Sequence, residues 1–434
     1  MSEQNRNENI RCLTDTEAAY GRFVPYQFLD LLGRPSIVDV QLGDHVEKEL
    51  TLLFSDIRDF TMLSESILPA ENFRFINSYL STMEPVVARH AGMVDKYIGD
   101  GIMALFPGCA DDGVRSGIDM LRRLVNYNQG RARAGYVPIR IGIGVNTGMV
   151  MMGTVGGPNR MDSTVIGDAV NLASRLEGLT KNYGTPLIIS EHTYHSLEDK
   201  NAYCIRFLDR LRVKGRYQAQ SVYEVFDADP EPMWLSKQET KGVFEEALAY
   251  FHMGHPERSK PLLEECLRVA PDDKAARVYL DRCVEAEQHG SLETAGESMR
   301  DIAWRNEYSV LISEIDAQHQ DLLVNFGILA EQVNRGASNV PELLAALSEQ
   351  TAAHFATEEN LMRRYSYPFS EEHLRQHQTF IKSLEEFRRE ILSGERDKLY
   401  LLFLIQLRLV DWQINHTTKS DYHLGHFLLR AGLS

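Results

Sequence analysis

Two stretches of sequence decide the fold of the first half of the chain: TLLFSDIRDFT at residues 51–61 and DKYIGDGIMALFP at residues 95–107. In each, a run of apolar, β-favouring residues meets an acidic residue, Asp56 or Asp100. Glycine on both sides of Asp100 indicates a tight turn. Further β-type runs, such as IRIGIGV and TPLIIS, alternate with helical patterns as far as residue 226. We therefore predict a sheet with packed helices over this part of the chain.

Asp56 and Asp100 are candidate metal ligands. Carboxylates at the ends of strands can hold hard divalent cations such as Mg²⁺ or Mn²⁺, which prefer oxygen ligands. Spacing alone leaves a second interpretation open, in which each aspartate only caps a turn.

Five sequence blocks follow one another along the chain: FSDIRDFT, DKYIGDGIMALFP, IRIGIGVNTGMV, MDSTVIGDAVNLASRLE and VKGR. Their order favours the metal interpretation, because it resembles the class III nucleotidyl cyclase family over roughly residues 22–226. The 44-residue step from Asp56 to Asp100 also fits that family. The chain departs from it at Asp59, where the family usually has glycine. The fold that the resemblance implies is α+β and ferredoxin-like.

The resemblance implies two-metal cyclisation of ATP to 3′,5′-cyclic AMP with release of pyrophosphate. Asp56 and Asp100, assisted by the backbone of Ile57, would hold two Mg²⁺ or Mn²⁺ ions. Asn171 would orient the ribose, and Arg175 would stabilise charge that builds up on the α-phosphate. The implied phosphate contacts come from Phe60, Thr61 and Lys214.

Lys96 and Thr164 stand where this family reads the purine edge. A lysine can donate to adenine N1 and a threonine hydroxyl can accept from the exocyclic amine, whereas guanine would favour a glutamate at the first position. We therefore expect an adenylate cyclase, with an ordinary surface role as the alternative for Lys96. Because the family takes its metal-binding and base-reading residues from different subunits, the chain is expected to form a homodimer with two interfacial sites.

From Trp304 onward the pattern is almost wholly helical, with breaks near 335–341, 365–371 and 393–397 that predict four long helices. Two pairs of metal-ligand residues are spaced four apart, so each pair shares a helix face. A lone histidine on a helix is usually exposed or satisfied by a neighbour. Several such histidines on four amphipathic helices can instead build a metal site in a bundle core. The two pairs are His354 with Glu358 and His373 with His377.

This segment, about residues 302–431, resembles the bacteriohemerythrin family through IDAQH, HFATEENLM, YPFSEEHLRQHQTF and INHTTKSD. Five imidazoles and two carboxylates are more ligands than one tetrahedral zinc can take, and they suit a carboxylate-bridged pair of iron ions. The resemblance further implies an open coordination position that takes O₂, NO or another small anion. The step from His416 to Asp421 is five residues, so helical geometry alone does not select Asp421. The implied ligands are His319, His354, Glu358, His373, His377, His416 and Asp421.

These patterns predict four parts of a multidomain chain. Residues 1–47 are an N-terminal tail with a short helical lead-in, and residues 48–228 are the cyclase domain. Residues 237–289 predict a helix pair that resembles one tetratricopeptide unit, with a generic helical linker as the alternative. Residues 302–431 form the four-helix bundle.

Composition limits the partners and the cellular compartment that we expect for the protein. The net charge of −16 argues against general nucleic-acid binding, which needs a basic surface. The longest apolar run, at residues 399–410, is too short to span a bilayer and predicts a buried helix. We find no signal-peptide pattern, and five scattered cysteines without a CxxC motif indicate free thiols in a reducing cytoplasm.

The leading hypothesis is an adenylate cyclase regulated by a C-terminal diiron domain that senses O₂ or redox state. One alternative is a guanylate cyclase of the same architecture. Another is an O₂- or iron-binding protein with an inactive cyclase scaffold. Such a scaffold is expected to have lost Asp56, Asp100, Asn171 or Arg175, and all four are present.

Overall fold

The computed structural model describes residues 20–21, 24–65, 67–157, 159–212, 219–289, 302–394 and 396–433. These residues fall into two compact units. The first contains the described residues up to Ile205 together with Glu224–Asp229. The second contains Arg206–Tyr223 and the described residues from Pro230 onward.

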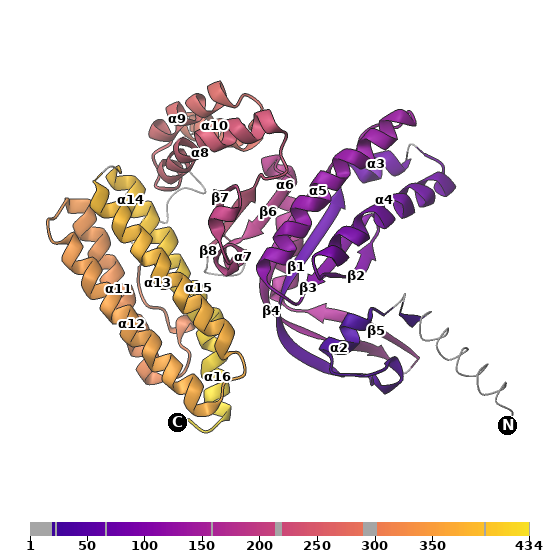
Figure 1. Ribbon diagram of the computed structural model, residues 1–434. Coiled ribbons are helices and arrows are strands. Elements are labelled where there is room, and N and C mark those ends of the chain that lie inside the picture. The colour runs from indigo at the N-terminus through magenta and orange to yellow at the C-terminus, as the bar shows by residue number, and fades with distance from the viewer. Residues whose placement is uncertain are drawn as a thin grey trace. The chain divides into compact units, whose positions relative to one another are not determined.

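The first unit is built on a sheet whose two central strands are long and antiparallel (Figure 1). These are β1 (His45–Ile57) and β4 (Ile141–Gly157), which pair from His45 opposite Gly153 to Ile57 opposite Ile141. Strand β3 lies on the other side of β1, and β2 lies beyond β3. The other neighbours of β4 are β6, which is parallel to it, and β5. Their bounds are β2 (Met93–Ile98), β3 (Gly101–Phe106), β5 (Arg160–Ile166) and β6 (Leu187–Ser190).

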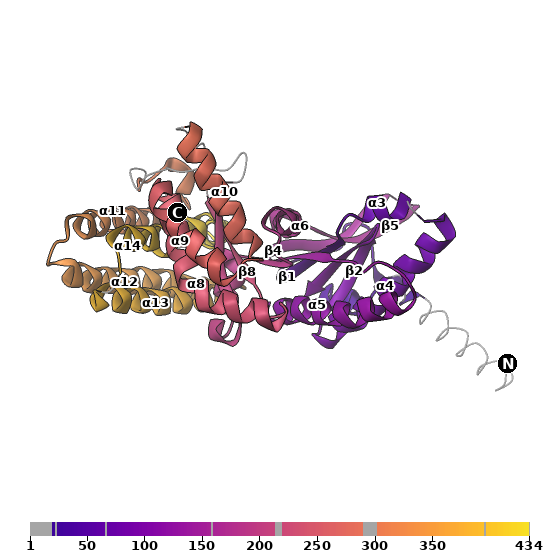
Figure 2. The same cartoon turned by 90° about the horizontal axis from the view of Figure 1, so that it is seen from above.

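Helices cover both faces of this sheet, with α4 and α5 on one side and α6 on the other (Figure 2). Glycine residues allow these helices to pack close to the sheet. A Cβ added at Gly144 would lie 2.2 Å from the α6 backbone at Glu177. Gly117 of α5 packs near Ile143, and successive strand residues point to opposite faces. The predicted sheet with packed helices is therefore confirmed. The helices are α2 (Tyr26–Leu31), α3 (Phe60–Glu65), α4 (Pro69–Arg89), α5 (Ala110–Arg133), α6 (Asp168–Tyr183) and α7 (Glu191–Ser196), with 3₁₀ turns at Ile37–Asp39 and Lys200–Ala202.

The second unit begins with most of strands β7 (Ile205–Arg212) and β8 (Ala219–Val225). Three helices follow where the sequence predicts a pair. A turn at Ala270–Asp273 separates the last two, and the backbone N–H of Asp273 donates to the Ala270 carbonyl there. The helices are α8 (Glu231–His252), α9 (Pro256–Val269) and α10 (Lys274–His289).

The remainder of the second unit is an all-helical bundle with breaks at the predicted places. The chain from Lys398 to Arg430 is one continuous helical rod made of α14, α15, α16 and two π-helical segments. The π-helical segments are Gln406–Val410 and Thr417–Asp421. Among the described residues, no helix combines the length and the apolarity needed to cross a bilayer. The helices are α11 (Ser313–Arg335), α12 (Val340–Tyr365), α13 (Ser370–Ser393), α14 (Lys398–Ile405), α15 (Asp411–His416) and α16 (Tyr422–Arg430), preceded by a 3₁₀ turn at Asn306–Tyr308.

Candidate active site and candidate metal centre

The two predicted metal-binding aspartates meet at one end of strand β1. The backbone N–H of Ile57 donates to Asp100 Oδ2 at 3.0 Å and to Asp56 Oδ1 at 3.1 Å. Asp100 is only 9% exposed. Burial, followed by the hydrogen bond and the negative charge of Asp56, raises the pKa of Asp100 to about 7. A divalent cation would relieve this repulsion, so the pair fits the hard cation that the sequence predicts.

The backbone around the aspartates adopts left-handed conformations that few residues tolerate. Gly99, in the turn before Asp100, has a φ of 66°. Asp59 has a φ of 58°, at the position where the cyclase resemblance leads one to expect glycine. Aspartate is among the few non-glycine residues found in this region. An aspartate at this position is therefore compatible with the left-handed backbone found here.

The two predicted base-reading residues also lie together. Lys96 Nζ, on β2, donates to Thr164 Oγ1, on β5, at 2.9 Å. The lysine also lies 3.2 Å from Asp95 Oδ2. Burial raises the pKa of Asp95 despite this positive neighbour. The sequence separation of 68 residues between Lys96 and Thr164 is thus bridged within one chain.

The other predicted cyclase residues do not join these two groups. Asn171 and Arg175 are exposed, one turn apart on α6, and no hydrogen bond or ion pair among the described residues ties either one to Asp56 or Lys96. Phe60 begins α3 and stacks on Phe75, and Thr61 is exposed beside it. Lys214 lies outside the described residues.

Sequence reasoning missed a partly buried ion pair beside the aspartates. Arg58 Nη1 lies 3.1 Å from Glu177 Oε1, and both side chains are 15% exposed. The guanidinium crosses strand β4 at Gly142, where an added Cβ would lie 1.8 Å from Arg58 Nη2. The pair therefore ties the loop after Asp56 to α6, the helix that carries Arg175. The only sequence signal is a charged residue in each of two motifs, which does not indicate pairing.

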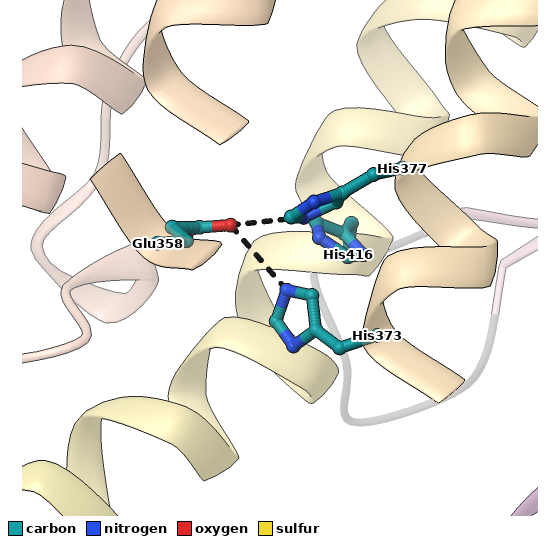
Figure 3. Close-up of side chains that lie close together, drawn as sticks. All are labelled: Glu358, His373, His377 and His416. Atoms are coloured by element: carbon teal, nitrogen blue, oxygen red, sulfur yellow. Dashed lines mark hydrogen bonds and ion pairs between the residues drawn. The ribbon is translucent and has the colours of Figure 1, made fainter. Parts of the chain in front are cut away.

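The seven predicted iron ligands gather in the core of the C-terminal bundle and are all buried. Their donor atoms form two groups, each within 4.8 Å. Glu358 belongs to both groups, as a bridging carboxylate would. Figure 3 shows the first group, with Glu358 of α12 facing histidines from α13 and α15. The groups are Glu358, His373, His377 and His416, and His319, His354, Glu358 and Asp421.

The contacts inside this cluster are short but poorly aligned for hydrogen bonding. The Nε2 atoms of His377 and His319 lie 3.0 Å and 3.1 Å from oxygens of Glu358 and Asp421 respectively. Those nitrogens, and both oxygens of Asp421, nevertheless lack a hydrogen-bond partner with acceptable geometry among the described residues. Buried polar atoms are seldom left this way in proteins. Converging lone pairs fit a site for cations, and this donor set of imidazoles and carboxylates suits iron.

The electrostatics of the cluster also favour ligation. Burial lowers the pKa of His416 to about 4, which keeps the imidazole neutral as a metal ligand requires. Burial opposes the ionisation of Asp421, but His416, His319 and His373 outweigh it and hold the pKa of Asp421 well below its usual value. Burial likewise lowers the pKa of His373, yet the nearby carboxylates of Asp421 and Glu358 outweigh burial and raise that pKa to about 9, so a metal would have to displace a proton from this imidazole.

Three further residues orient the histidines, and the sequence prediction did not include them. Each is the immediate neighbour of a predicted ligand and reaches a ligand on another helix. A side-chain oxygen accepting from Nδ1–H fixes the tautomer that leaves Nε2 available to a metal. Because adjacent helical residues point about 100° apart, the neighbour of an inward ligand faces the next helix. The contacts to Nδ1 are from Gln318 to His354 (3.0 Å), from Gln376 to His416 (2.9 Å) and from Glu359 to His377 (3.3 Å).

The π-helical segment Thr417–Asp421 explains the five-residue step that the sequence left unexplained. In a π-helix the backbone hydrogen bond spans five residues, so Asp421 comes onto the face of His416. Their side chains lie 3.0 Å apart, between Nε2 and Oδ1.

Comparison with known families agrees with both resemblances. Residues 44–226 match the adenylate and guanylate cyclase catalytic domain, and residues 310–427 match the hemerythrin HHE cation binding domain. Two separate parts of the chain therefore match two different domain families, in the order that the sequence predicts.

Individual relatives match parts of the chain. An adenylate cyclase of Anabaena cylindrica is 42% identical over 219 residues, covering 49% of this chain and 44% of the relative. The terminal-differentiation-specific adenylate cyclase of Dictyostelium discoideum is 34% identical over 64% of this chain and 13% of its own length. The chain therefore spans less than half of either relative. The crystal structure of the adenylyl cyclase CyaB from P. aeruginosa is 34% identical with a TM-score of 0.38, covering 42% of this chain and 95% of that one.

Proposed function

We propose that this protein is an adenylate cyclase that converts ATP to 3′,5′-cyclic AMP and pyrophosphate, and that its diiron domain regulates it. The observation that carries the proposal is the pair Asp56 and Asp100, held by the Ile57 N–H at 3.1 Å and 3.0 Å. The relatives named adenylate cyclases support the choice of reaction. When bound, two Mg²⁺ or Mn²⁺ ions would supply Lewis-acid chemistry at the ribose hydroxyl and the triphosphate.

The chain's own residues would position the nucleotide. Lys96 and Thr164 present a donor and an acceptor 2.9 Å apart, which match adenine N1 and the exocyclic amine. On α6, Asn171 would orient the ribose, and Arg175 would stabilise negative charge on the α-phosphate. Phe60, Thr61 and Lys214 would contact the phosphates.

A homodimer is part of this proposal. Asn171 and Arg175 are exposed and have no described contact with the aspartates of their own chain. A second copy, related by a two-fold axis, would bring its α6 residues to the Asp56–Asp100 pair, and the reverse contact would complete a second site. We also place the protein in the cytoplasm, since it would consume ATP and the four described cysteines form no disulfide with one another.

The C-terminal domain would serve as the sensor. When bound, a pair of irons would supply a redox-active site for O₂, NO or a small anion. Five histidines with Glu358 and Asp421 would hold the pair, three histidines in one group and two in the other. Both groups contain four residues, and the group with only two histidines is the one where an external ligand would fit. Regulation requires that two states of this centre favour different cyclase conformations.

The test is an assay of ATP and GTP turnover by the purified full chain with Mg²⁺ or Mn²⁺. Iron content and the optical spectrum are recorded in parallel, under anaerobic reducing conditions and in air. We expect cyclic AMP to form and the rate to differ between the two gas conditions. Dimeric, metal-loaded protein that consumes neither nucleotide would refute the cyclase, whereas equal rates in both conditions would remove the sensing role alone.

A further inference from the structure

Strand β7 makes an unusually strong contact with the last rod of the bundle, inside the second unit. Arg210 donates to Asp411 through two nitrogens, Nε to Oδ2 at 2.6 Å and Nη2 to Oδ1 at 2.8 Å. The side chain of Asp411 is 4% exposed and that of Arg210 is 16% exposed. A bidentate pair of this kind fixes orientation as well as distance. Around it, Phe207 packs edge-on against Phe403 with ring centroids 5.3 Å apart.

Asp411 belongs to a polar row that leads to the predicted iron ligands. Gln406, Asp411, His416 and Asp421 recur every five residues, a spacing that an α-helix scatters around its surface. The π-helical segments Gln406–Val410 and Thr417–Asp421 supply the wider turns that bring Gln406 to Asp411 and His416 to Asp421, and the α-helix α15 runs from Asp411 to His416. Gln406 Nε2 donates to Asp411 Oδ1 at 2.8 Å, and His416 Nε2 lies 3.0 Å from Asp421 Oδ1.

The other side chains of β7 are anchored just as firmly to the helices α8–α10. Arg206 is buried and forms a bidentate pair with Asp273, at 2.7 Å and 2.9 Å. Asp209 lies 3.2 Å from His252 and 3.4 Å from Arg282. Strand β7 is therefore held between the connector helices and the ligand-bearing rod, with charged side chains that tolerate little displacement.

We infer that the Arg210–Asp411 pair links the iron centre to strand β7, so that the state of the irons sets the position and stability of that strand. The inference rests on the proposed function for its ligand set and deepens it by naming the route of regulation. A shift of His416 or Asp421 moves the π-helical rod, and a buried ion pair transmits the shift because separating the charges is costly. Four residues after Arg210 the chain reaches Lys214, the proposed phosphate contact. Linkage is reciprocal, so disturbing β7 also weakens iron binding.

The experiment measures hydrogen–deuterium exchange at residues 206–212 and 219–223 in the full chain, with and without Fe(II), under anaerobic conditions. ATP turnover is compared in the same samples with and without air. In the wild type we expect iron to slow exchange in β7. In Arg210→Gln and in Asp411→Asn, each loaded with iron, we expect that difference to be lost and the turnover ratio between gas conditions to approach one.

Arg258→Gln is the matched control. Arg258 lies 3.1 Å from Asp397, so this is a second Arg–Asp pair that reaches the same rod. It lies at the N-terminal end of the rod, and its side chains are 40% and 34% exposed. This variant is expected to keep the wild-type exchange difference and turnover ratio.

Two results would overturn the linkage. One is a rate of exchange in β7 of the wild type that is the same with and without iron, and the other is an iron-dependent difference in exchange that persists in Arg210→Gln or Asp411→Asn. The first needs no variant to fold. Absence of turnover in every sample would refute the proposed cyclase, yet the exchange measurement would still decide the linkage.

Discussion

At the scale of single residues, Asp100 meets two opposing demands. Its carboxylate would hold a cation, yet burial and Asp56 raise its pKa from 3.8 to about 7. In metal-free protein, ionising Asp100 therefore lowers the free energy of unfolding. This loss is fully present above pH 7 and becomes small below about pH 4. We expect Asp100→Asn to abolish ATP turnover and, in EDTA at pH 8, to raise the melting temperature by a few degrees.

The pH dependence supplies the control for this prediction. Near pH 3 Asp100 is protonated in the folded protein and mostly protonated in the unfolded chain, where its pKa is 3.8, so the gain in melting temperature should largely vanish. Scanning calorimetry of both proteins at the two pH values measures the effect. A variant less stable than the wild type at pH 8 would contradict the proposed repulsion between the aspartates.

Lys96 and Thr164 decide the base at the same scale. Lys96→Glu removes the donor to adenine N1 and creates an acceptor for guanine N1–H, and Thr164→Asn adds an amide that can donate to guanine O6. We expect the double variant to shift the ratio of kcat/KM for ATP over GTP by roughly 10- to 100-fold towards GTP, since a mismatched hydrogen bond costs about 1–3 kcal/mol when buried and less at a lysine that is 37% exposed. Nucleotide competition assays measure the shift, and an unchanged ratio would remove both residues from base recognition.

At the scale of elements, the Arg58–Glu177 pair joins β1 to α6. Burial lowers the pKa of Arg58 and raises that of Glu177, so each charge depends on the other. Glu177→Gln should destabilise the first unit by about 1–3 kcal/mol, because it leaves a partly buried guanidinium without its counter-charge. Replacing both, as Arg58→Met with Glu177→Leu, should cost less than either single change. Urea unfolding in a double-mutant cycle measures this, and additive losses would refute the coupling.

Elements with a clear period were predictable from the sequence, and elements that break the period were not. The strand runs around Asp56 and the helix breaks near 335–341 and 365–371 follow from alternation and turn residues. The π-helical segment at Thr417–Asp421 carries no such signal, because its hydrogen bonding depends on packing in the bundle. Asp421 was therefore found only through the family resemblance.

The same limit applies to the residues around the candidate site. Ligands spaced four apart, such as His373 and His377, are visible in the sequence because helix geometry places them on one face. Partners on different elements, such as Gln376 with His416 or Arg210 with Asp411, depend on tertiary placement. Lys96 and Thr164 are an intermediate case: the family pattern pointed to both, but their contact required the fold.

At the scale of the whole molecule, the two candidate sites lie in separate compact units and should fail separately. His377→Ala removes a ligand from the three-histidine group, so we expect loss of bound iron and of the optical spectrum while basal ATP turnover remains measurable. His423→Ala, on α16 but outside the ligand set, is the control and should keep its iron. If His377→Ala also lost all turnover while remaining folded, iron would be required for the cyclase rather than regulatory.

The proposed homodimer can be tested by mixing two inactive variants, because each active site would contain residues from both chains. Asp100→Asn removes a metal ligand and Arg175→Ala removes the residue that acts on the α-phosphate, so each variant alone should be inactive. In a mixed dimer one site combines both defects, whereas the other combines the intact aspartates of one chain with the intact α6 of its partner. Random mixing of equal amounts makes half the dimers mixed, so turnover should recover to about a quarter of the wild-type rate. Co-refolding followed by an ATP assay measures the recovery, with each variant refolded alone as the control. Sites contained within single chains would give no recovery, because no mixture could then assemble an intact set.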